Sequence, residues 1–312
     1  MNYNHPLLST EYQLNTPTME YVIENVCFKV LMRKTGVVFT GEPRIGKTRC
    51  CEALVIGIPK KFKNIYVFML VATNRTLNTQ YSSVVHQLLE LEGIKPNSRV
   101  SFIERQSMLI ERFKLRAGEH GANQIVMIVD ELQRLSARDF DQLADIYNRL
   151  RQHKITLTVV SFAMPTVEGA ISDYLQSGSG RHIVGRFFTD IKPLHGVTSK
   201  KDLHTILSLY DTCGSSHSAI SFTEEVLPKA YRNGFRMGSL ADQLWDSMSK
   251  VVSGKYVKNL PMEHVTQSVA YIYLICSHED RESLSVPADL VEDAVKQSNL
   301  DQFCRKVSMG DI

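Results

Sequence analysis

Short runs of apolar residues recur along the first two thirds of the chain, and each has the length of a buried β-strand. They are residues 37–40 (VVFT), 65–71 (IYVFMLV), 125–129 (IVMIV) and 155–162 (ITLTVVSF). Continuous apolar runs of this kind predict strands that are covered on both faces, as in a parallel sheet. Helical periodicity separates them, at about residues 48–56, 77–91, 100–117 and 139–153 and again after Pro165. The alternation predicts an α/β fold with a parallel sheet sandwiched by helices.

The strand pattern stops near residue 196, and the rest of the chain has helical periodicity only. The expected helices are residues 200–210, 223–231, 236–251, 262–275 and 288–303. We therefore expect an α/β domain over residues 21–195 and a smaller all-helical domain with a C-terminal tail over residues 196–312. Residues 1–20 contain Pro6 and Pro17 and show no clean periodicity, which predicts an extended N-terminal arm.

A glycine-containing octapeptide lies between the first predicted strand and the helix that follows it. Its sequence, GEPRIGKT, fits the pattern G-x-x-x-x-G-K-[ST], in which backbone N–H groups surround a phosphate chain. The following helix would direct its positive N-terminal end at the phosphates, which an ordinary glycine turn does not require. We expect Lys47 to reach the β- and γ-phosphates and Thr48 to bind Mg²⁺. The predicted nucleotide-contacting residues are Gly41, Glu42, Pro43, Arg44, Ile45, Gly46, Lys47, Thr48 and Arg49.

Two adjacent carboxylates, Asp130 and Glu131, follow the third apolar run. In open α/β sheets, ligands bind at the carboxyl ends of the strands, so these residues are expected beside the phosphates. An aspartate at this place holds Mg²⁺, and a neighbouring glutamate can act as the base that activates water. The alternative is a pair of solvated loop acids. No N-K-x-D motif for guanine is present, which favours ATP as the nucleotide.

Composition narrows the class of protein further. The chain has 312 residues, of which 43% are hydrophobic, and a formal net charge of +3, which is too small to indicate nucleic-acid binding on its own. No apolar run approaches the roughly 20 residues of a membrane span, and the N-terminus lacks a signal-peptide pattern, so a soluble cytoplasmic protein is expected. The six cysteines include no C-x-x-C pair, so neither a zinc site nor a disulfide framework is indicated.

Together these motifs resemble the AAA+ ATPases of the initiator and helicase-loader branch over roughly residues 20–300. The stretches VSFAMPTVEGAISD and GRFFTDIKPL are most similar to the transposition regulators of the TnsC/TniB family, in the compact form found in CRISPR-associated transposons. The resemblance implies that the helical domain is a lid. It also implies that Ser161 takes the sensor-one place near the γ-phosphate, although a serine hydroxyl here could simply cap a turn.

Three arginines acquire candidate roles from this resemblance. Arg186, followed by Phe187, resembles the finger that one subunit inserts into the nucleotide site of the next, and Arg181 is its rival. Arg236 takes the sensor-two place, where the lid contacts the γ-phosphate. Each of the three could instead be a surface charge. A finger supplied by a neighbour implies a homo-oligomer, either a head-to-tail ring or a helical filament that ATP favours.

A basic segment over residues 95–117 is a candidate for DNA binding. It carries six basic residues against two acidic ones, Glu104 and Glu111. At about 100° per residue, Arg105, Arg112 and Arg116 share one helix face. This stripe could follow DNA phosphates in a largely sequence-independent manner, or it could be a solvated basic face. The predicted DNA-contacting residues are Arg99, Arg105, Arg112, Lys114 and Arg116.

The resulting hypothesis is an ATPase that assembles on double-stranded DNA with ATP, connects a target-selection protein complex to transposase subunits, and disassembles on hydrolysis. A helicase- or initiator-loading ATPase would need the same ATP and DNA chemistry but a different partner. A signal-transducing ATPase would assemble without DNA.

Overall fold

In the computed structural model the chain divides into two units, each with its own core. The structure describes residues 4–9, 12–73, 83–176, 180–215 and 219–309. An α/β unit comprises residues 21–41 and 47–194. A helical unit comprises residues 1–20, 42–46 and 195–312.

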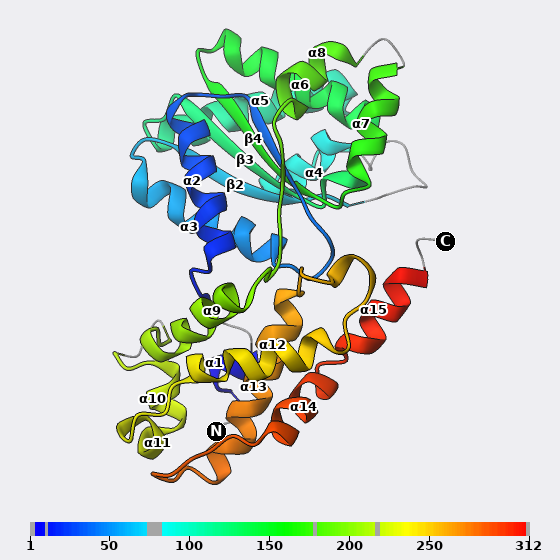
Figure 1. Ribbon diagram of the computed structural model, residues 1–312. Helices are drawn as coiled ribbons and strands as arrows, with labels where there is room; N and C mark the ends of the chain where they lie inside the picture. The colour runs from blue at the N-terminus through cyan, green and yellow to red at the C-terminus, as the bar shows by residue number, and fades with distance from the viewer. Residues whose placement is uncertain (1–3, 10–11, 74–82, 177–179, 216–218, 310–312) are drawn as a thin grey trace. The chain divides into compact units, whose positions relative to one another are not determined.

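A five-stranded parallel sheet forms the centre of the α/β unit, with strand order β2-β3-β4-β1-β5 (Figure 1). The strands are β1 (Gly36–Thr40), β2 (Tyr66–Val71), β3 (Gln124–Asp130), β4 (Thr156–Ala163) and β5 (Ile191–Pro193). The first four confirm the predicted apolar runs. The short β5 was not predicted, because three residues that include a lysine and a proline form no apolar run.

Helices cover both faces of this sheet. They are α2 (Pro17–Leu31), α3 (Lys47–Lys61), α4 (Val84–Leu91), α5 (Phe102–Glu119), α6 (Ala137–Gln152), α7 (Val167–Gln176) and α8 (Arg181–Ile183), with a 3-10 turn η1 (Leu132–Arg134) and a π-helical turn η2 (Val184–Phe188). Alternate strand side chains such as Val38, Met127 and Val159 share one core with α4, α5 and α6. On the other face α3 packs against β2, β3 and β4, and Tyr21 of α2 contacts Phe39 of β1 edge to face.

The helical unit has a separate core. Its helices are α1 (Pro6–Ser9), α9 (Lys200–Thr212), α10 (Phe222–Val226), α11 (Pro228–Arg232), α12 (Ala241–Ser249), α13 (Met262–His278), α14 (Ala288–Gln297) and α15 (Leu300–Met309), with 3-10 turns η3 (Met237–Leu240) and η4 (Gly254–Tyr256). Two predicted helices are each divided. Pro228, which has no N–H to donate, separates α10 from α11, and Asn299, with φ of 58°, separates α14 from α15.

The described part of the N-terminal segment, residues 4–9 and 12–20, is not the extended arm that the sequence suggested. It contains α1 and the beginning of α2, and Leu7 and Leu14 are buried in the core of the helical unit. The two buried leucines hold this segment against the helices. The sequence did not predict this packing, because isolated apolar residues have no periodicity. The predicted helix over residues 77–91 is described only from Val84 onward as α4, because residues 74–82 lie outside the described residues.

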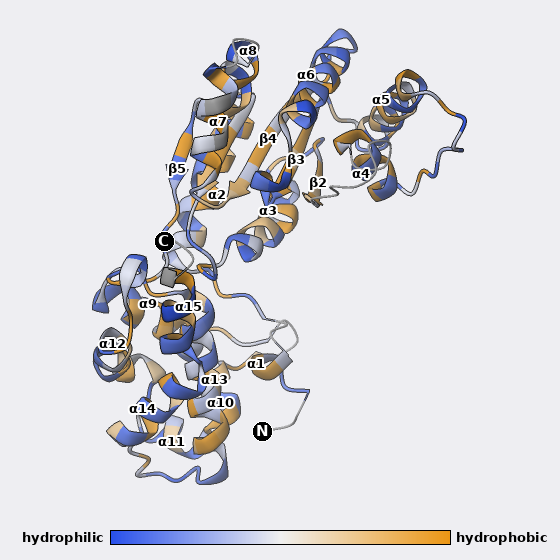
Figure 2. Cartoon of the chain, turned by 90° about the vertical axis from the view of Figure 1, so that its right-hand side faces the viewer, coloured by the Kyte–Doolittle hydropathy of each residue, from blue (hydrophilic) through white to orange (hydrophobic). Residues whose placement is uncertain are grey.

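Hydropathy follows this organisation. In Figure 2, hydrophobic residues colour much of β3 and β4, which lie between the helices of the α/β unit. In the described part of the chain, none of the helices combines the length and the apolar character that crossing a bilayer would demand.

Gly36, at the start of β1, lies close to the backbone of η2, so its substitution measures how tightly the sheet packs on this turn. A Cβ added to Gly36 would lie 2.6 Å from the carbonyl oxygen of Phe187 and 2.8 Å from its Cα, whereas nothing lies within 4 Å of a Cβ added to Gly57 in α3. We expect Gly36→Ala to lower the free energy of unfolding by about 1–3 kcal/mol. The control Gly57→Ala should raise it by roughly 0.5–1 kcal/mol, because alanine favours helix. Urea unfolding followed by circular dichroism measures both, and equal effects would contradict the close packing at Gly36.

Candidate nucleotide-binding site

The predicted phosphate-binding loop connects β1 to α3 and is anchored at both ends. The N–H of Gly41 donates a hydrogen bond to the carbonyl of Ala163, at the end of β4, over 3.1 Å. The ammonium group of Lys47 donates to the carbonyl of Gly41 over 2.8 Å, and this side chain is buried. The Lys47 side chain therefore folds back along the loop. Phosphates bound in this loop are the groups that Lys47 is expected to contact.

Thr48 and Asp130 meet at the carboxyl edge of the sheet. The hydroxyl of Thr48 donates to Asp130 Oδ2 over 2.7 Å, although the two residues are 82 positions apart. Asp130 is the last residue of β3 and is buried. The predicted pair of metal ligands is thus brought together in space.

The two side chains suit Mg²⁺, which prefers oxygen ligands and commonly takes one or two carboxylates together with phosphate and water. Among the described residues there is no cluster of three or more histidine, cysteine or acidic side chains that could hold a metal ion by themselves. Nucleotide phosphates and water would therefore have to complete the coordination of a magnesium ion held by Thr48 and Asp130.

The neighbouring cysteines offer no competing chemistry. Cys50 and Cys51 are buried in α3. Burial and the negative charge of Asp130 raise the pKa of Cys50 to about 12 and that of Cys51 further, so both thiols are neutral at physiological pH. Because a thiol must ionise to act as a nucleophile or a metal ligand, the two residues serve as small core side chains.

Glu131 has a constrained backbone. Its backbone lies in the left-handed region, with φ of 59° and ψ of 41°, which few non-glycine residues adopt. Its carboxylate oxygen Oε2 accepts hydrogen bonds from Gln133 Nε2 over 2.8 Å and from Arg134 Nε over 3.3 Å. The sequence did not single out Gln133, since a glutamine two positions after a glutamate is no motif by itself.

Residues 42–46 of the predicted phosphate-binding loop belong to the helical unit. Arg44 adopts a left-handed backbone, its guanidinium pairs with Glu263 of α13 over 3.1 Å, and it lies 4.6 Å from the ring centre of Phe303. The Glu263 N–H also donates to the Arg44 carbonyl. The Arg44 side chain is therefore held by α13 and α15. This leaves the backbone of Arg44 for its predicted contact with a nucleotide.

Comparison with known proteins agrees with this geometry. Residues 31–171 match the family model described as AAA domain. The fold is that of the AAA+ P-loop NTPases. A search of curated proteins finds no match.

Solved structures of the AAA+ fold cover nearly the whole chain. The ORC2 protein of Aeropyrum pernix in its ADP form is 14% identical, with a TM-score of 0.58, over 93% of this chain and 70% of that chain. Cdc6p of Pyrobaculum aerophilum is 10% identical, with a TM-score of 0.60, over 90% and 68%. The ORC1 protein of Aeropyrum pernix in complex with DNA is 13% identical, with a TM-score of 0.51, over 89% and 64%.

Within this AAA+ fold, Ser161 is not at the end of its strand. Strand β4 continues to Ala163, and Ser161 pairs in register with Val129 of β3 and Val38 of β1. It is almost completely buried. Ser161 thus lies two residues before the end of β4, and its sensor-one role remains a prediction.

The two finger candidates differ in how they are held. The guanidinium of Arg186, in η2, donates to Asn148 Oδ1 over 3.1 Å and lies 4.6 Å from the ring centre of Tyr147, both in α6. Arg181, in α8, is exposed, and no hydrogen bond or ion pair with another described residue holds its side chain. Arg181 is thus the more accessible of the two.

Arg236 lies in a fixed turn of the helical unit, just before η3. Its guanidinium donates to the carbonyls of Tyr231 and Phe235 over 2.8 and 2.7 Å and stacks 3.7 Å from the Tyr231 ring centre. The buried carboxylate of Asp211 accepts hydrogen bonds from the N–H groups of Met237 and Gly238. The predicted helix over residues 236–251 therefore begins as a 3-10 turn, which determines the backbone direction next to Arg236.

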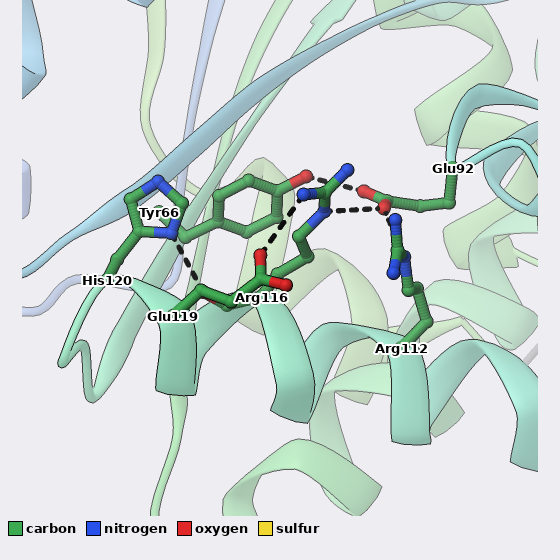
Figure 3. A network of polar contacts seen from close by, with 6 residues as sticks. All are labelled: Tyr66, Glu92, Arg112, Arg116, Glu119 and His120. Carbon is green, nitrogen blue, oxygen red and sulfur yellow. Dashed lines mark hydrogen bonds and ion pairs between the residues drawn. The ribbon is translucent and has the colours of Figure 1, made fainter.

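The basic face of α5 is largely occupied within the chain. Arg112 and Arg116 both donate through Nε to Glu92 Oε2, over 2.9 and 3.0 Å, and Tyr66 donates to the other oxygen (Figure 3). Arg105 is buried and donates to the carbonyl of Val100. The three arginines therefore do not form the exposed stripe that helical periodicity suggested.

Of the remaining two candidates on this segment, Arg99 is exposed and Lys114 is half-buried, about as accessible as Arg116. Arg99 lies in the loop before α5, and Lys114 pairs with Glu111 on the outer face of the helix over 2.9 Å. Their DNA-binding role remains a prediction.

Glu92 lies at the centre of this network, with a side chain that is 3% exposed. Burial disfavours its charged form, but the hydrogen bonds from Tyr66 and the two arginines outweigh this effect and hold the pKa of Glu92 below its ordinary value. A buried carboxylate with three donors stabilises the packing of α4 on α5 and β2.

Removing this charge should destabilise the α/β unit. We expect Glu92→Gln to lower the free energy of unfolding by about 2 kcal/mol at neutral pH, because two arginines lose a buried partner. Since the pKa of Glu92 is lowered on folding, its contribution is present above the ordinary value of 4.5 and is lost as the pH falls below it. The control Glu119→Gln removes an exposed partner of Arg116 and should change stability by less than about 0.5 kcal/mol. Urea unfolding at several pH values measures these effects, and equal losses in the two variants would contradict the central role of Glu92.

Proposed function

We propose that this protein is a magnesium-dependent ATPase. The observation that carries the proposal is the contact of the Thr48 hydroxyl with the buried Asp130 carboxylate, beside Lys47 and Glu131. A hydroxyl, a carboxylate, a buried lysine and a second carboxylate at one edge of a parallel sheet supply the groups needed for phosphoryl transfer to water.

Each residue has a distinct task in the proposed reaction. Lys47 and the loop N–H groups bind the β- and γ-phosphates, and Thr48 with Asp130 would hold Mg²⁺, which would neutralise charge on the phosphate oxygens. Glu131 accepts a proton from water as the water oxygen bonds to the γ-phosphorus. The bond from that phosphorus to the oxygen that bridges it to the β-phosphorus breaks, which releases ADP and phosphate.

We further propose that the site is completed by an arginine of a neighbouring copy. Arg181 becomes the preferred finger, since Arg186 is held by Tyr147 and Asn148 of its own chain. A site that takes one residue from the next subunit favours head-to-tail assembly when ATP is bound. Ser161 and Arg236 are proposed to sense the γ-phosphate from β4 and from the helical unit.

Assembly on double-stranded DNA, as part of transposition, is the wider role that we propose. It is supported by the sequence resemblance to the TnsC/TniB regulators and by the likeness of the fold to an ORC1 protein that was solved in complex with DNA. Transposase subunits and a target-selection complex are the proposed partners. The internal pairing of Arg112 and Arg116 is the observation that favours a DNA-independent signalling ATPase instead.

Two variants separate nucleotide binding from hydrolysis. Lys47→Ala should abolish binding of a fluorescent ATP analogue, because the phosphates lose their cationic contact. Glu131→Gln should retain ATP with little change in affinity but lose roughly 100-fold or more in kcat, and should accumulate in the assembled state. Light scattering with ATP follows assembly. Loss of assembly in both variants alike would contradict a mechanism in which ATP binding drives assembly and hydrolysis drives disassembly.

The basic segment can be tested through its salt dependence. We expect replacement of Arg99 and Lys114 by glutamine to weaken binding of a DNA duplex and to reduce the slope of log K against log salt by roughly 1 for each lost phosphate contact. Lys63→Gln, an exposed lysine outside this segment, is the control. An unchanged slope in the double variant would remove these residues from the DNA site and favour the signalling alternative.

A further inference from the structure

We propose that Gln133 is a positioning residue for the base Glu131 and that it connects this base to the phosphate-binding loop. This inference rests on the proposed function, because it concerns the hydrolytic step of the same site. It assigns a role to a side chain that is neither part of the G-x-x-x-x-G-K-[ST] loop nor of the Asp130-Glu131 pair.

The amide of Gln133 makes two hydrogen bonds in opposite directions. Its Nε2 donates to Glu131 Oε2 over 2.8 Å, and its Oε1 accepts from the backbone N–H of Met164 over 3.1 Å. The orientation of the amide is determined by its partners, because a backbone N–H can only donate and a carboxylate can only accept. Gln133 therefore bridges the end of β3 to the residue that follows β4.

The same peptide group continues the connection to the phosphate-binding loop. The N–H of Met164 binds Gln133, while the carbonyl of Ala163, on the other side of that peptide bond, accepts from the N–H of Gly41 over 3.1 Å. Because a peptide group is planar and rigid, its two hydrogen bonds keep a fixed relation. An uninterrupted series of hydrogen bonds thus extends from Gly41 through Ala163–Met164 and Gln133 to Glu131.

Glu131 needs such a restraint more than an ordinary surface glutamate does. Its backbone is left-handed and its side chain is 28% exposed, so neither helix packing nor burial fixes its rotamer. Its second donor, Arg134, is 50% exposed and bonds over 3.3 Å. An exposed ion pair of this kind contributes little, which leaves the Gln133 amide as the principal restraint.

The arrangement also leaves one oxygen of the base free to react. Both donors bind Oε2, and within the described chain no residue donates to Oε1 of Glu131. Gln133 therefore holds the carboxylate while leaving Oε1 available to a water molecule. Since the efficiency of a general base depends on its placement, a movement of about 1 Å can cost roughly 100-fold in rate.

Steady-state ATP hydrolysis by the full chain, with duplex DNA present, tests the proposal. Gln133→Met keeps the length of the side chain but makes neither hydrogen bond, and we expect kcat to fall roughly 10- to 100-fold with KM for ATP within about twofold. Gln133→Glu keeps an acceptor for Met164 but cannot donate to Glu131, and it should be at least as impaired. Gln152→Met, at the exposed end of α6, is the matched control and should match the wild type.

A double-variant cycle separates positioning from general damage to the fold. If Gln133 acts through Glu131, Gln133→Met should have little further effect on kcat in a Glu131→Gln background, instead of multiplying the two losses. A merely structural role would give multiplied losses and a matching fall in melting temperature, and it would overturn the proposal. Wild-type kcat in Gln133→Glu would overturn it as well.

The same measurements distinguish this inference from the proposed function. Full activity of Glu131→Gln, or absence of hydrolysis by the wild type, would refute the ATPase mechanism itself. A severe loss in Glu131→Gln together with normal activity in both Gln133 variants would refute only the role of Gln133.

Discussion

The hydrogen bond between the Thr48 hydroxyl and the Asp130 carboxylate depends on the parallel arrangement of the whole α/β unit. Asp130 ends β3, Thr48 follows the loop after β1, and β4 lies between these two strands. Parallel strands present their carboxyl ends at the same edge, so every residue that follows a strand converges there. The same constraint places Gly41 against Ala163 and therefore fixes the loop in which a phosphate chain is expected to lie.

Arginines of similar appearance in the sequence have different environments in the structure. Arg112 and Arg116 stabilise the α/β unit through a buried carboxylate, Arg44 is held by α13 and α15, and Arg186 stacks on Tyr147. Arg181 is exposed in α8. Because an arginine that is already paired must break contacts before it binds a ligand, accessibility rather than charge ranks these residues as candidates for function.

The candidate site is supported by neutral polar contacts between loops as well as by the exposed ion pair of Glu131 with Arg134. The Gln133 amide and the Ala163–Met164 peptide group link Glu131 to Gly41 of the predicted phosphate-binding loop, and both are neutral. Neutral donors can orient a carboxylate without adding a second charge beside the phosphates. In the helical unit, the Asp211 carboxylate similarly fixes the turn that follows Arg236, from a residue that lies 25 positions earlier.

Sequence by itself determined the four longer strands, the glycine-containing loop between β1 and α3, and the place of Asp130 and Glu131 after β3, because each belongs to a continuous local pattern or directly follows one. It also predicted the division into an α/β part and a helical part. Tertiary structure alone decided that Arg105 is buried, that Glu92 pairs with Arg112 and Arg116, that Leu7 and Leu14 join the helical core, and that Gln133 reaches Met164. The physical reason is that periodicity gives the direction of a side chain on its own element, whereas the neighbours that bury or bind it come from distant parts of the chain.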